Sequence, residues 1–247
     1  GDTISALAAG CPVIFKAHPA HPKTGDLVGS AISKAVASCG LPAGVFALIH
    51  GSSHEVGSHL VQHPDISAVG FTGSYRGGKA LYDLAVRRPH PIPVYAEMGS
   101  VNPIFLLPGV LQSDDKELAS KVAASVTLGV GQFCTNPGIL VGIQSESLDS
   151  FRSHLTDLLE QVPSAPMLHE GIQRAYQSHA AAHRAQPGVS TCVRANELEE
   201  GMASPQLTVV DADRFMSNAQ LQQEVFGPAT LLVVCKDKEQ LLAVAQT

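Results

Sequence analysis

The sequence predicts an α/β protein in which parallel strands are joined by crossover helices. Through the first hundred residues, short apolar runs typical of buried strands alternate with amphipathic segments of helical period. Hydrophobic residues make up 45% of the 247 residues and charged residues 15%, which is enough apolar material for a large core. Because the length exceeds the roughly 100–200 residues of a typical domain, we expect two domains.

The first block contains the strand and helix alternation. Strands are expected at 12–16, 45–49, 68–72, 94–97 and 104–107, and helices at 4–9, 25–38, 54–62 and 78–86. Asp2 and Thr3 are the predicted caps of the first helix, Thr24 is the predicted cap of the second, and Gly40 follows that helix. The strand at 12–16 is expected to be buried. This order of elements predicts a parallel sheet covered by helices.

The second block continues the α/β pattern. Helices are expected at 116–130, 148–161 and 237–245, strands at 138–143, 207–211 and 230–235, and a mixture of helix and loop at 163–205. We place the domain boundary near residue 98, so that the domains are 1–97 and 98–247. Because the chain begins without Met and stops inside a predicted helix, we expect it to be an internal piece of a longer protein.

Composition excludes several classes of function. The chain has 16 Lys and Arg against 22 Asp and Glu, a net charge of −6, which opposes binding to nucleic acid phosphates. No apolar run reaches the roughly 20 residues of a membrane span, and no signal peptide is recognisable. The five cysteines are widely spaced, which favours a reducing compartment, and we expect a cytoplasmic protein. Among the 11 histidines, His18 and His21 lie in a proline-rich loop without further ligands, so no metal site is expected.

Two side chains are candidates for catalysis. Cys134 lies in the polar loop Gly-Gln-Phe-Cys-Thr-Asn-Pro-Gly. The other four cysteines, Cys11, Cys39, Cys192 and Cys235, lie in strand-like runs or at a helix end and are predicted to be small buried residues. A nucleophilic thiol must be activated, because a free thiol is only a few per cent ionised at pH 7. Glu97 ends a strand before a glycine turn. It is either a desolvated general base or an exposed carboxylate.

Three further segments are candidates for binding an anion or a ribose. Phe-Thr-Gly-Ser-Tyr-Arg-Gly-Gly at 71–78 joins a strand to a helix, whose N-terminus favours negative charge. A tight turn that needs glycine explains this segment almost as well. Lys16 closes a strand and Glu224 precedes the last strand. Each is either a ribose ligand or an ordinary charge at a strand boundary.

Taken in order, these segments resemble the aldehyde dehydrogenase superfamily over essentially the whole chain. The resemblance rests on Lys16 after a strand and on four motifs: Phe-Thr-Gly-Ser ending at Ser74, Glu-Met-Gly beginning at Glu97, Gly-Gln-Phe-Cys ending at Cys134, and Glu-Val-Phe-Gly-Pro beginning at Glu224. Ser100 and Val101 occupy positions where most family sequences have Gly and Lys. In this respect the motif is similar to that of the branch of 2,5-dioxovalerate (α-ketoglutarate semialdehyde) dehydrogenases.

The resemblance implies an aldehyde dehydrogenase fold with a Rossmann-type NAD(P)-binding domain at 1–97 and a catalytic thiol domain at 98–247, both incomplete. It implies that Cys134 attacks a small aldehyde, giving a thiohemiacetal and then a thioester, and that Glu97 activates the hydrolytic water. Cofactor contacts are implied for Lys16, Gly73, Ser74, Glu224 and Phe226. A homo-oligomer is implied for the full-length protein.

The resemblance also sets limits. An oxyanion-hole Asn is expected upstream of residue 1, so the 247-residue chain alone is expected to be inactive or nearly so. Pro19 stands where NAD-specific relatives often carry an acidic residue, so NADP is slightly favoured over NAD. Two alternatives stay open: a dehydrogenase that passes the acyl group to coenzyme A, and a truncated scaffold without catalysis.

Overall fold

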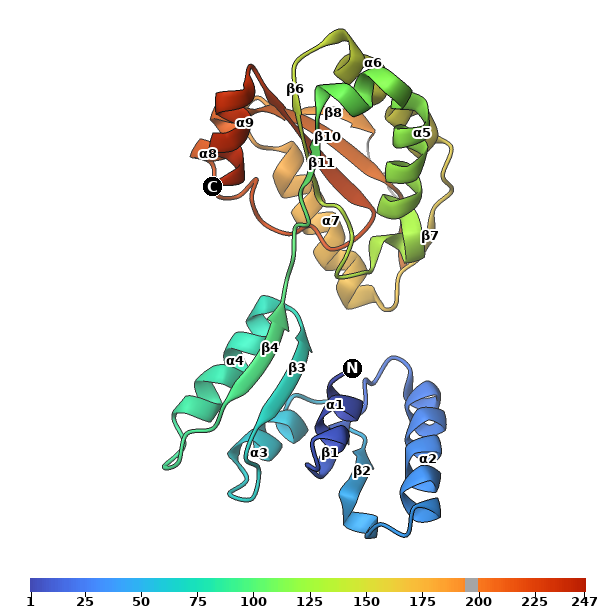
Figure 1. The fold of residues 1–247 in the computed structure, drawn as a ribbon, viewed down its shortest axis with the longest axis vertical. Coiled ribbons are helices and arrows are strands. Elements are labelled where there is room, and N and C mark those ends of the chain that lie inside the picture. The colour runs from blue at the N-terminus through green and yellow to red at the C-terminus, as the bar shows by residue number, and fades with distance from the viewer. Residues whose placement is uncertain (194–199) are drawn as a thin grey trace. The chain divides into compact units, whose positions relative to one another are not determined.

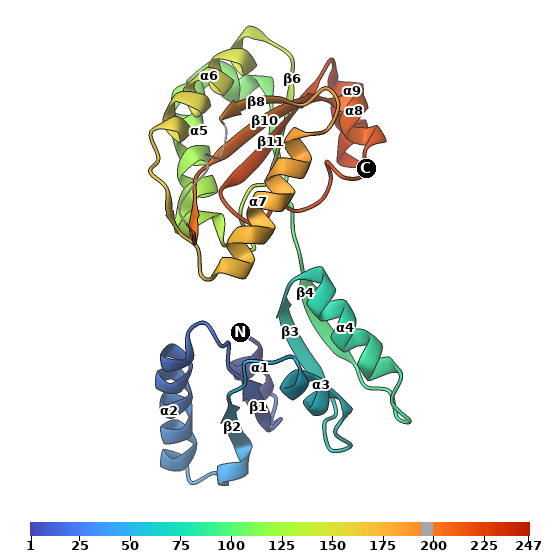
Figure 2. The same ribbon diagram turned by 180° about the vertical axis from the view of Figure 1, so that it is seen from behind.

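The computed structural model describes residues 1–193 and 200–247 and divides into two compact units, Gly1–Gly99 and Ser100–Thr247. Figures 1 and 2 show the helices and strands of each unit from opposite sides. Both units mix helices with parallel strands, so the predicted α/β class is confirmed. We call them the N-terminal unit and the C-terminal unit.

The N-terminal unit, which is described throughout, contains two pairs of parallel strands rather than one continuous sheet. The strands are β1 (Val13–Lys16) with β2 (Phe46–Ile49), and β3 (Val69–Gly73) with β4 (Val94–Met98). The helices are α1 (Asp2–Ala8), α2 (Pro22–Ser38), α3 (Glu55–Gln62) and α4 (Tyr75–Val86), and a 3₁₀ turn covers Ala43–Val45. Helix α2 packs closely on β2, because a Cβ at Gly29 would lie 2.9 Å from Leu48 Cδ2.

Several local predictions for this unit were wrong. The strand β1 is not buried: the side chains of Ile14 and Phe15 are 47% and 43% exposed. Helix α2 begins at Pro22 with His21 as its cap, so Thr24 lies inside the helix; proline suits the first helical position because that N–H has no helical partner. Helix α1 is capped by Gly1, and neither Asp2 nor Thr3 caps it.

Within residues 100–193 and 200–247, the main feature is a five-stranded sheet in the order β5-β6-β11-β10-β8. Its strands are β5 (Ile104–Leu106), β6 (Ile139–Ile143), β11 (Ala229–Cys235), β10 (Gln206–Asp211) and β8 (Ser190–Val193). Neighbouring strands are parallel except for β8, which runs antiparallel to β10 at the edge. A short antiparallel pair, β7 (Ala165–Pro166) with β9 (Met202–Ala203), lies outside this sheet.

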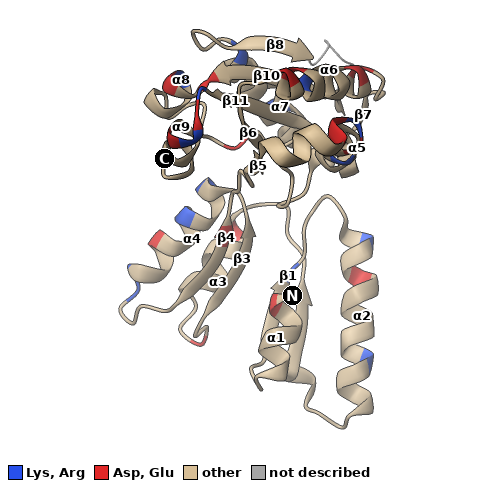
Figure 3. Cartoon of the chain, turned by 45° about the horizontal axis from the view of Figure 1, so that its top comes forward, with Lys and Arg blue, Asp and Glu red and all other residues tan. Residues whose placement is uncertain are grey.

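Both faces of this sheet are buried. Leu140 and Leu232 join the cluster formed with α5 (Pro108–Thr127) and α6 (Glu146–Glu160). Their neighbours Val141 and Val233 belong to the opposite cluster, with α8 (Ala212–Ser217) and α9 (Lys238–Ala245). Figure 3 shows β6 and β11 without charged residues, as expected for parallel strands covered by helices on both sides. Helix α7 (Glu170–Arg184) contributes Tyr176 to a third, smaller cluster.

The C-terminal unit also differs from the sequence prediction in detail. Helix α5 begins at Pro108, eight residues before the predicted start, because a kink at Asp114 joins two helical segments. It ends at Thr127, and a 3₁₀ turn follows at Leu128–Gly131. Helix α8 and strand β8 were not predicted as separate elements. In the described parts of the chain, every helix is too short or too polar to cross a membrane.

Candidate active site

Cys134 lies in a loop, residues 129–138, that follows helix α5; we call it the thiol loop. Three consecutive residues, Gly129, Val130 and Gly131, have positive φ of 56°, 59° and 64°. At Gly131 a Cβ would also lie 2.2 Å from the carbonyl oxygen of Gly227. Glycine is required there both by the backbone conformation and by the close approach of a second backbone. The thiol loop therefore lies directly against residue 227.

The backbone of Cys134 is held by two side chains from the start of this unit. The carbonyl oxygen of Cys134 accepts hydrogen bonds from Ser100 Oγ at 2.5 Å and from Asn102 Nδ2 at 2.6 Å. Asn102 Nδ2 also donates to the carbonyl oxygen of Asn136 at 3.0 Å. Asn102 itself has φ of 41°, a conformation that asparagine tolerates better than most residues. The Cys134 side chain is exposed, so its thiol is accessible while hydrogen bonds hold its backbone.

A second loop, residues 218–228, carries Glu224 and Phe226; we call it the Glu224 loop. Asn136 connects the two loops, because its Nδ2 donates to the carbonyl oxygen of Gly227 at 3.1 Å. Both Glu224 and Phe226 are half-buried. Burial raises the pKa of the Glu224 carboxyl above its usual value, while the backbone N–H of Ser100 partly opposes this. Ser100 thus contacts both the Cys134 backbone and the Glu224 carboxyl.

Three other residues of the predicted site, Gly73, Ser74 and Glu97, lie at one edge of the β3–β4 pair in the N-terminal unit. Thr72 is paired with Glu97 and Gly73 with Met98, so Ser74 follows at the same carboxyl edge. Ser74 caps the 12-residue helix α4, and its Oγ accepts the N–H of Gly77 at 3.2 Å. The glycine run is explained by packing rather than by an unusual turn, because a Cβ at Gly78 would lie 2.3 Å from Met98 Sδ.

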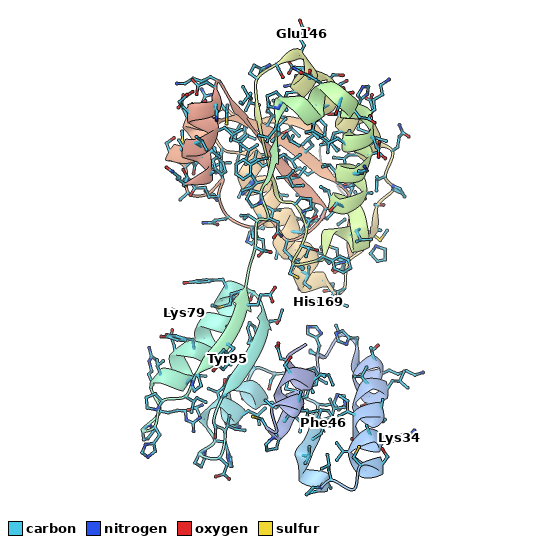
Figure 4. All side chains as sticks on the ribbon, in the orientation of Figure 1. Lys34, Phe46, Lys79, Tyr95, Glu146 and His169 are labelled. Atoms are coloured by element: carbon cyan, nitrogen blue, oxygen red, sulfur yellow. The ribbon has the colours of Figure 1, made fainter. Side chains whose placement is uncertain are left out.

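Glu97 and Lys16 occupy different sheets of the N-terminal unit. Glu97 is exposed near the end of β4, as is Tyr95 two residues earlier on the same face; Figure 4 labels Tyr95. Within this unit, therefore, Glu97 is not the desolvated carboxyl that one interpretation of the sequence expected. Lys16 is half-buried at the end of β1. The pairing of Cys134 with Glu97 joins residues of the two units and stays a prediction.

The other cysteines have varied environments. Cys11 and Cys39 are exposed, so the prediction that both are buried was wrong. Burial raises the pKa of the half-buried Cys192 thiol and raises that of the buried Cys235 thiol to about 11. Cys192 and Cys235 are therefore poor nucleophiles at neutral pH, which leaves three exposed thiols.

The histidines of the proline-rich loop form a stacked pair. The ring centroids of His18 and His21 lie 5.0 Å apart with an interplanar angle of 15°. His50, which follows β2, lies near this end of α2, where its Nε2 is 2.7 Å from Asp26 Oδ1. Within residues 1–193 and 200–247, no three His, Cys, Asp or Glu side chains are grouped closely enough to hold a metal ion.

Sequence reasoning missed the two residues that anchor the thiol loop. Ser100 differs from the glycine that is commoner in the family at this position, and Asn102 has no role in the site predicted from the sequence. They lie 34 and 32 positions before Cys134, and no local periodicity reports a contact across that distance. One local pattern could have indicated Asn102: it precedes Pro103 and follows a glycine turn, and this combination favours a turn conformation of the backbone.

Comparisons with known proteins all indicate the same family. The aldehyde dehydrogenase family matches over residues 1–247. Alpha-ketoglutaric semialdehyde dehydrogenase 2 of Azospirillum brasilense is 46% identical over 100% of this chain and 47% of its own length. Alpha-ketoglutaric semialdehyde dehydrogenase of Acinetobacter baylyi is 43% identical over 98% of this chain and 46% of its own length. The chain therefore spans about half the length of these curated relatives.

A solved structure shows the same fold. The NAD-dependent benzaldehyde dehydrogenase of Corynebacterium glutamicum aligns with a TM-score of 0.80 and 22% identity, over 98% of this chain and 52% of that one. At this identity the likeness shows the fold alone. The fold, the ordered motifs around Cys134 and the match over all 247 residues agree: the chain belongs to the aldehyde dehydrogenase family.

Proposed function

We propose that this chain contributes the thiol and the cofactor-binding residues of an NAD(P)-dependent dehydrogenase that oxidises a semialdehyde such as 2,5-dioxovalerate to a carboxylate. The observation that carries the proposal is the exposed Cys134 on a backbone held by Ser100 and Asn102. The semialdehyde is proposed because the relatives at 46% and 43% identity are alpha-ketoglutaric semialdehyde dehydrogenases. The homo-oligomeric state and the cytoplasmic location stay predictions.

Residues in both units suit a dinucleotide. The N-terminus of α4 offers backbone N–H groups, and Ser74 Oγ, which accepts from Gly77, keeps its own proton to donate to a phosphate oxygen. Lys16 and the Glu224 carboxylate can bind ribose hydroxyls, and the half-buried Phe226 ring can pack against the nicotinamide. A bound nicotinamide would supply the hydride acceptor for the oxidation. We propose residues 1–97 as the cofactor domain and 98–247 as the thiol domain.

In the proposed reaction, Cys134 Sγ attacks the aldehyde carbon and forms a thiohemiacetal. After loss of hydride the carbon is bound to Cys134 as a thioester. Glu97 then removes a proton from water, which attacks the thioester and releases the carboxylate and the thiol. Because Ser100 and Asn102 hold the Cys134 carbonyl and not its side chain, the thiol can change bonding while the backbone stays in place.

We expect a thiol reagent such as iodoacetamide to modify Cys134 before any other cysteine at pH 7. Cys11 and Cys39 are matched controls because they are also exposed, whereas Cys192 and Cys235 are shielded. Reactivity above that of equally exposed thiols is what a nucleophile requires. Mass spectrometry of digested samples would give the five rates. Equal rates for Cys134, Cys11 and Cys39 would contradict an activated thiol.

We expect NADP to be used at least as well as NAD. Position 19, three residues after Lys16, is a proline and offers no carboxylate to repel a 2′-phosphate. The nearby carboxylate of Asp26 is paired with His50. The measurement is kcat/KM for both cofactors with the full-length protein and one semialdehyde. A strong preference for NAD would overturn this expectation while leaving the thiol chemistry untouched.

A further inference from the structure

A small cavity in the C-terminal unit is lined in part by polar side chains from several elements. Its volume is about 20 Å³, and its walls come from the thiol loop, helix α7, the strands β10 and β11, and the Glu224 loop. Among the residues that the structure describes, three buried side-chain atoms lack a hydrogen-bond partner: Asn136 Oδ1, His183 Nε2 and Thr230 Oγ1. All three residues line this cavity.

The hydrogen-bonding roles of these atoms follow from their surroundings. Asn136 Nδ2 donates to the carbonyl oxygens of Gly227 and Ala229, which leaves Oδ1 as an acceptor. His183 is only 6% exposed, and burial lowers its pKa, so the ring is neutral at pH 7 and one nitrogen is an acceptor. Thr230 is 2% exposed, and its hydroxyl can donate. Two acceptors and one donor therefore line one small cavity.

We infer that this cavity binds one ordered water molecule, which donates to Asn136 Oδ1 and His183 Nε2 and accepts from the Thr230 hydroxyl. A water needs about 10–15 Å³ of such space and two to four polar partners, and this cavity offers both. Polar groups buried without partners are strongly disfavoured, so three in one cavity point to a ligand of water size.

The water site has a structural consequence for the proposed active site. Asn136 is two residues after Cys134, Thr230 belongs to the central strand β11, and His183 projects from α7 close to the backbone carbonyls of Gln220 and Gln223. One water molecule thus joins the thiol loop to the sheet and to the helix beside the Glu224 loop. Thr230 and His183 are positioning residues, because they reach the thiol loop through the water.

The test is a comparison of Thr230→Ser with Thr230→Val. Serine keeps the hydroxyl, whereas valine has nearly the shape of threonine without it. Thr156→Val is the control, because the Thr156 hydroxyl donates to the Arg152 carbonyl within helix α6. The readouts are a crystal structure that resolves ordered water, the number of long-lived waters from magnetic relaxation dispersion, and the melting temperature. None depends on turnover, so failure here is distinguishable from failure of the proposed function.

We expect one water in contact with Asn136, His183 and Thr230 in the wild-type protein and in Thr230→Ser. In Thr230→Val we expect the loss of one long-lived water and a melting temperature lower by roughly 2–4 °C, with no comparable change in Thr156→Val. If Thr230→Val does not fold, His183→Phe removes an acceptor with a ring of similar size and should give the same loss. A dry wild-type cavity, or a water that survives Thr230→Val unchanged, would overturn the inference.

Discussion

Replacement of Cys134 by alanine is expected to abolish aldehyde oxidation by the full-length protein, with kcat falling by about 10⁴-fold or more. The reason is chemical: without the sulfur, neither the thiohemiacetal nor the thioester can form. The loss should be in kcat rather than in the affinity for cofactor, because the residues proposed to bind the cofactor are unchanged. Steady-state production of reduced cofactor measures the first quantity, and fluorescence titration of the cofactor measures the second.

The structure allows this loss to be assigned to the thiol. Ser100 and Asn102 donate to the carbonyl oxygen of residue 134, which alanine retains, so the thiol loop should keep its conformation. The melting temperature should therefore change little. Cys39→Ala is the matched control, because it also removes an exposed thiol and should leave kcat unchanged. Substantial activity in Cys134→Ala would refute the proposed covalent mechanism, since the chemistry would then not need this sulfur.

The sequence predicted the elements of the C-terminal unit best where both faces of a strand are buried. β6 and β11 are continuous apolar runs, such as Ile-Leu-Val-Gly-Ile, and the structure places them at the centre of the sheet, within a residue of the expected bounds. The start of α5 was missed because the kink at Asp114 interrupts the helical period. Local periodicity predicts an element well when nothing within that element breaks the pattern.

Burial and contacts across long stretches of chain were predicted poorly. The apolar run of β1 resembles a buried strand, yet Ile14 and Phe15 are exposed, because burial depends on which elements cover a strand. The candidate site shows the same limit. Cys134 and Glu224 were found from their motifs, but the contacts that Ser100 makes with both depend on how the chain folds back, and no spacing rule expresses that.

Replacement of Glu97 by glutamine is expected to separate the two halves of the proposed reaction. Glutamine has nearly the same shape but cannot take a proton from water, so the thioester should form and then hydrolyse slowly. Stopped-flow measurement with the full-length protein should show a burst of one reduced cofactor per site. The steady turnover that follows should be slower than that of the wild-type protein by about 10²-fold or more. Glu55→Gln, at an exposed glutamate in the first turn of α3, is the control and should keep full turnover.

The outcomes of this experiment separate the remaining mechanisms. Glu97 is exposed on β4 within its own unit, so its proposed role requires that it reach the thioester on Cys134, a residue of the other unit. Loss of the burst would assign Glu97 to acylation or to folding rather than to hydrolysis. Undiminished steady turnover would show that another group activates water. If turnover of the wild-type enzyme requires added coenzyme A, the acyl group is transferred to the thiol of coenzyme A and not to water. Glu97 would then have no role as a general base.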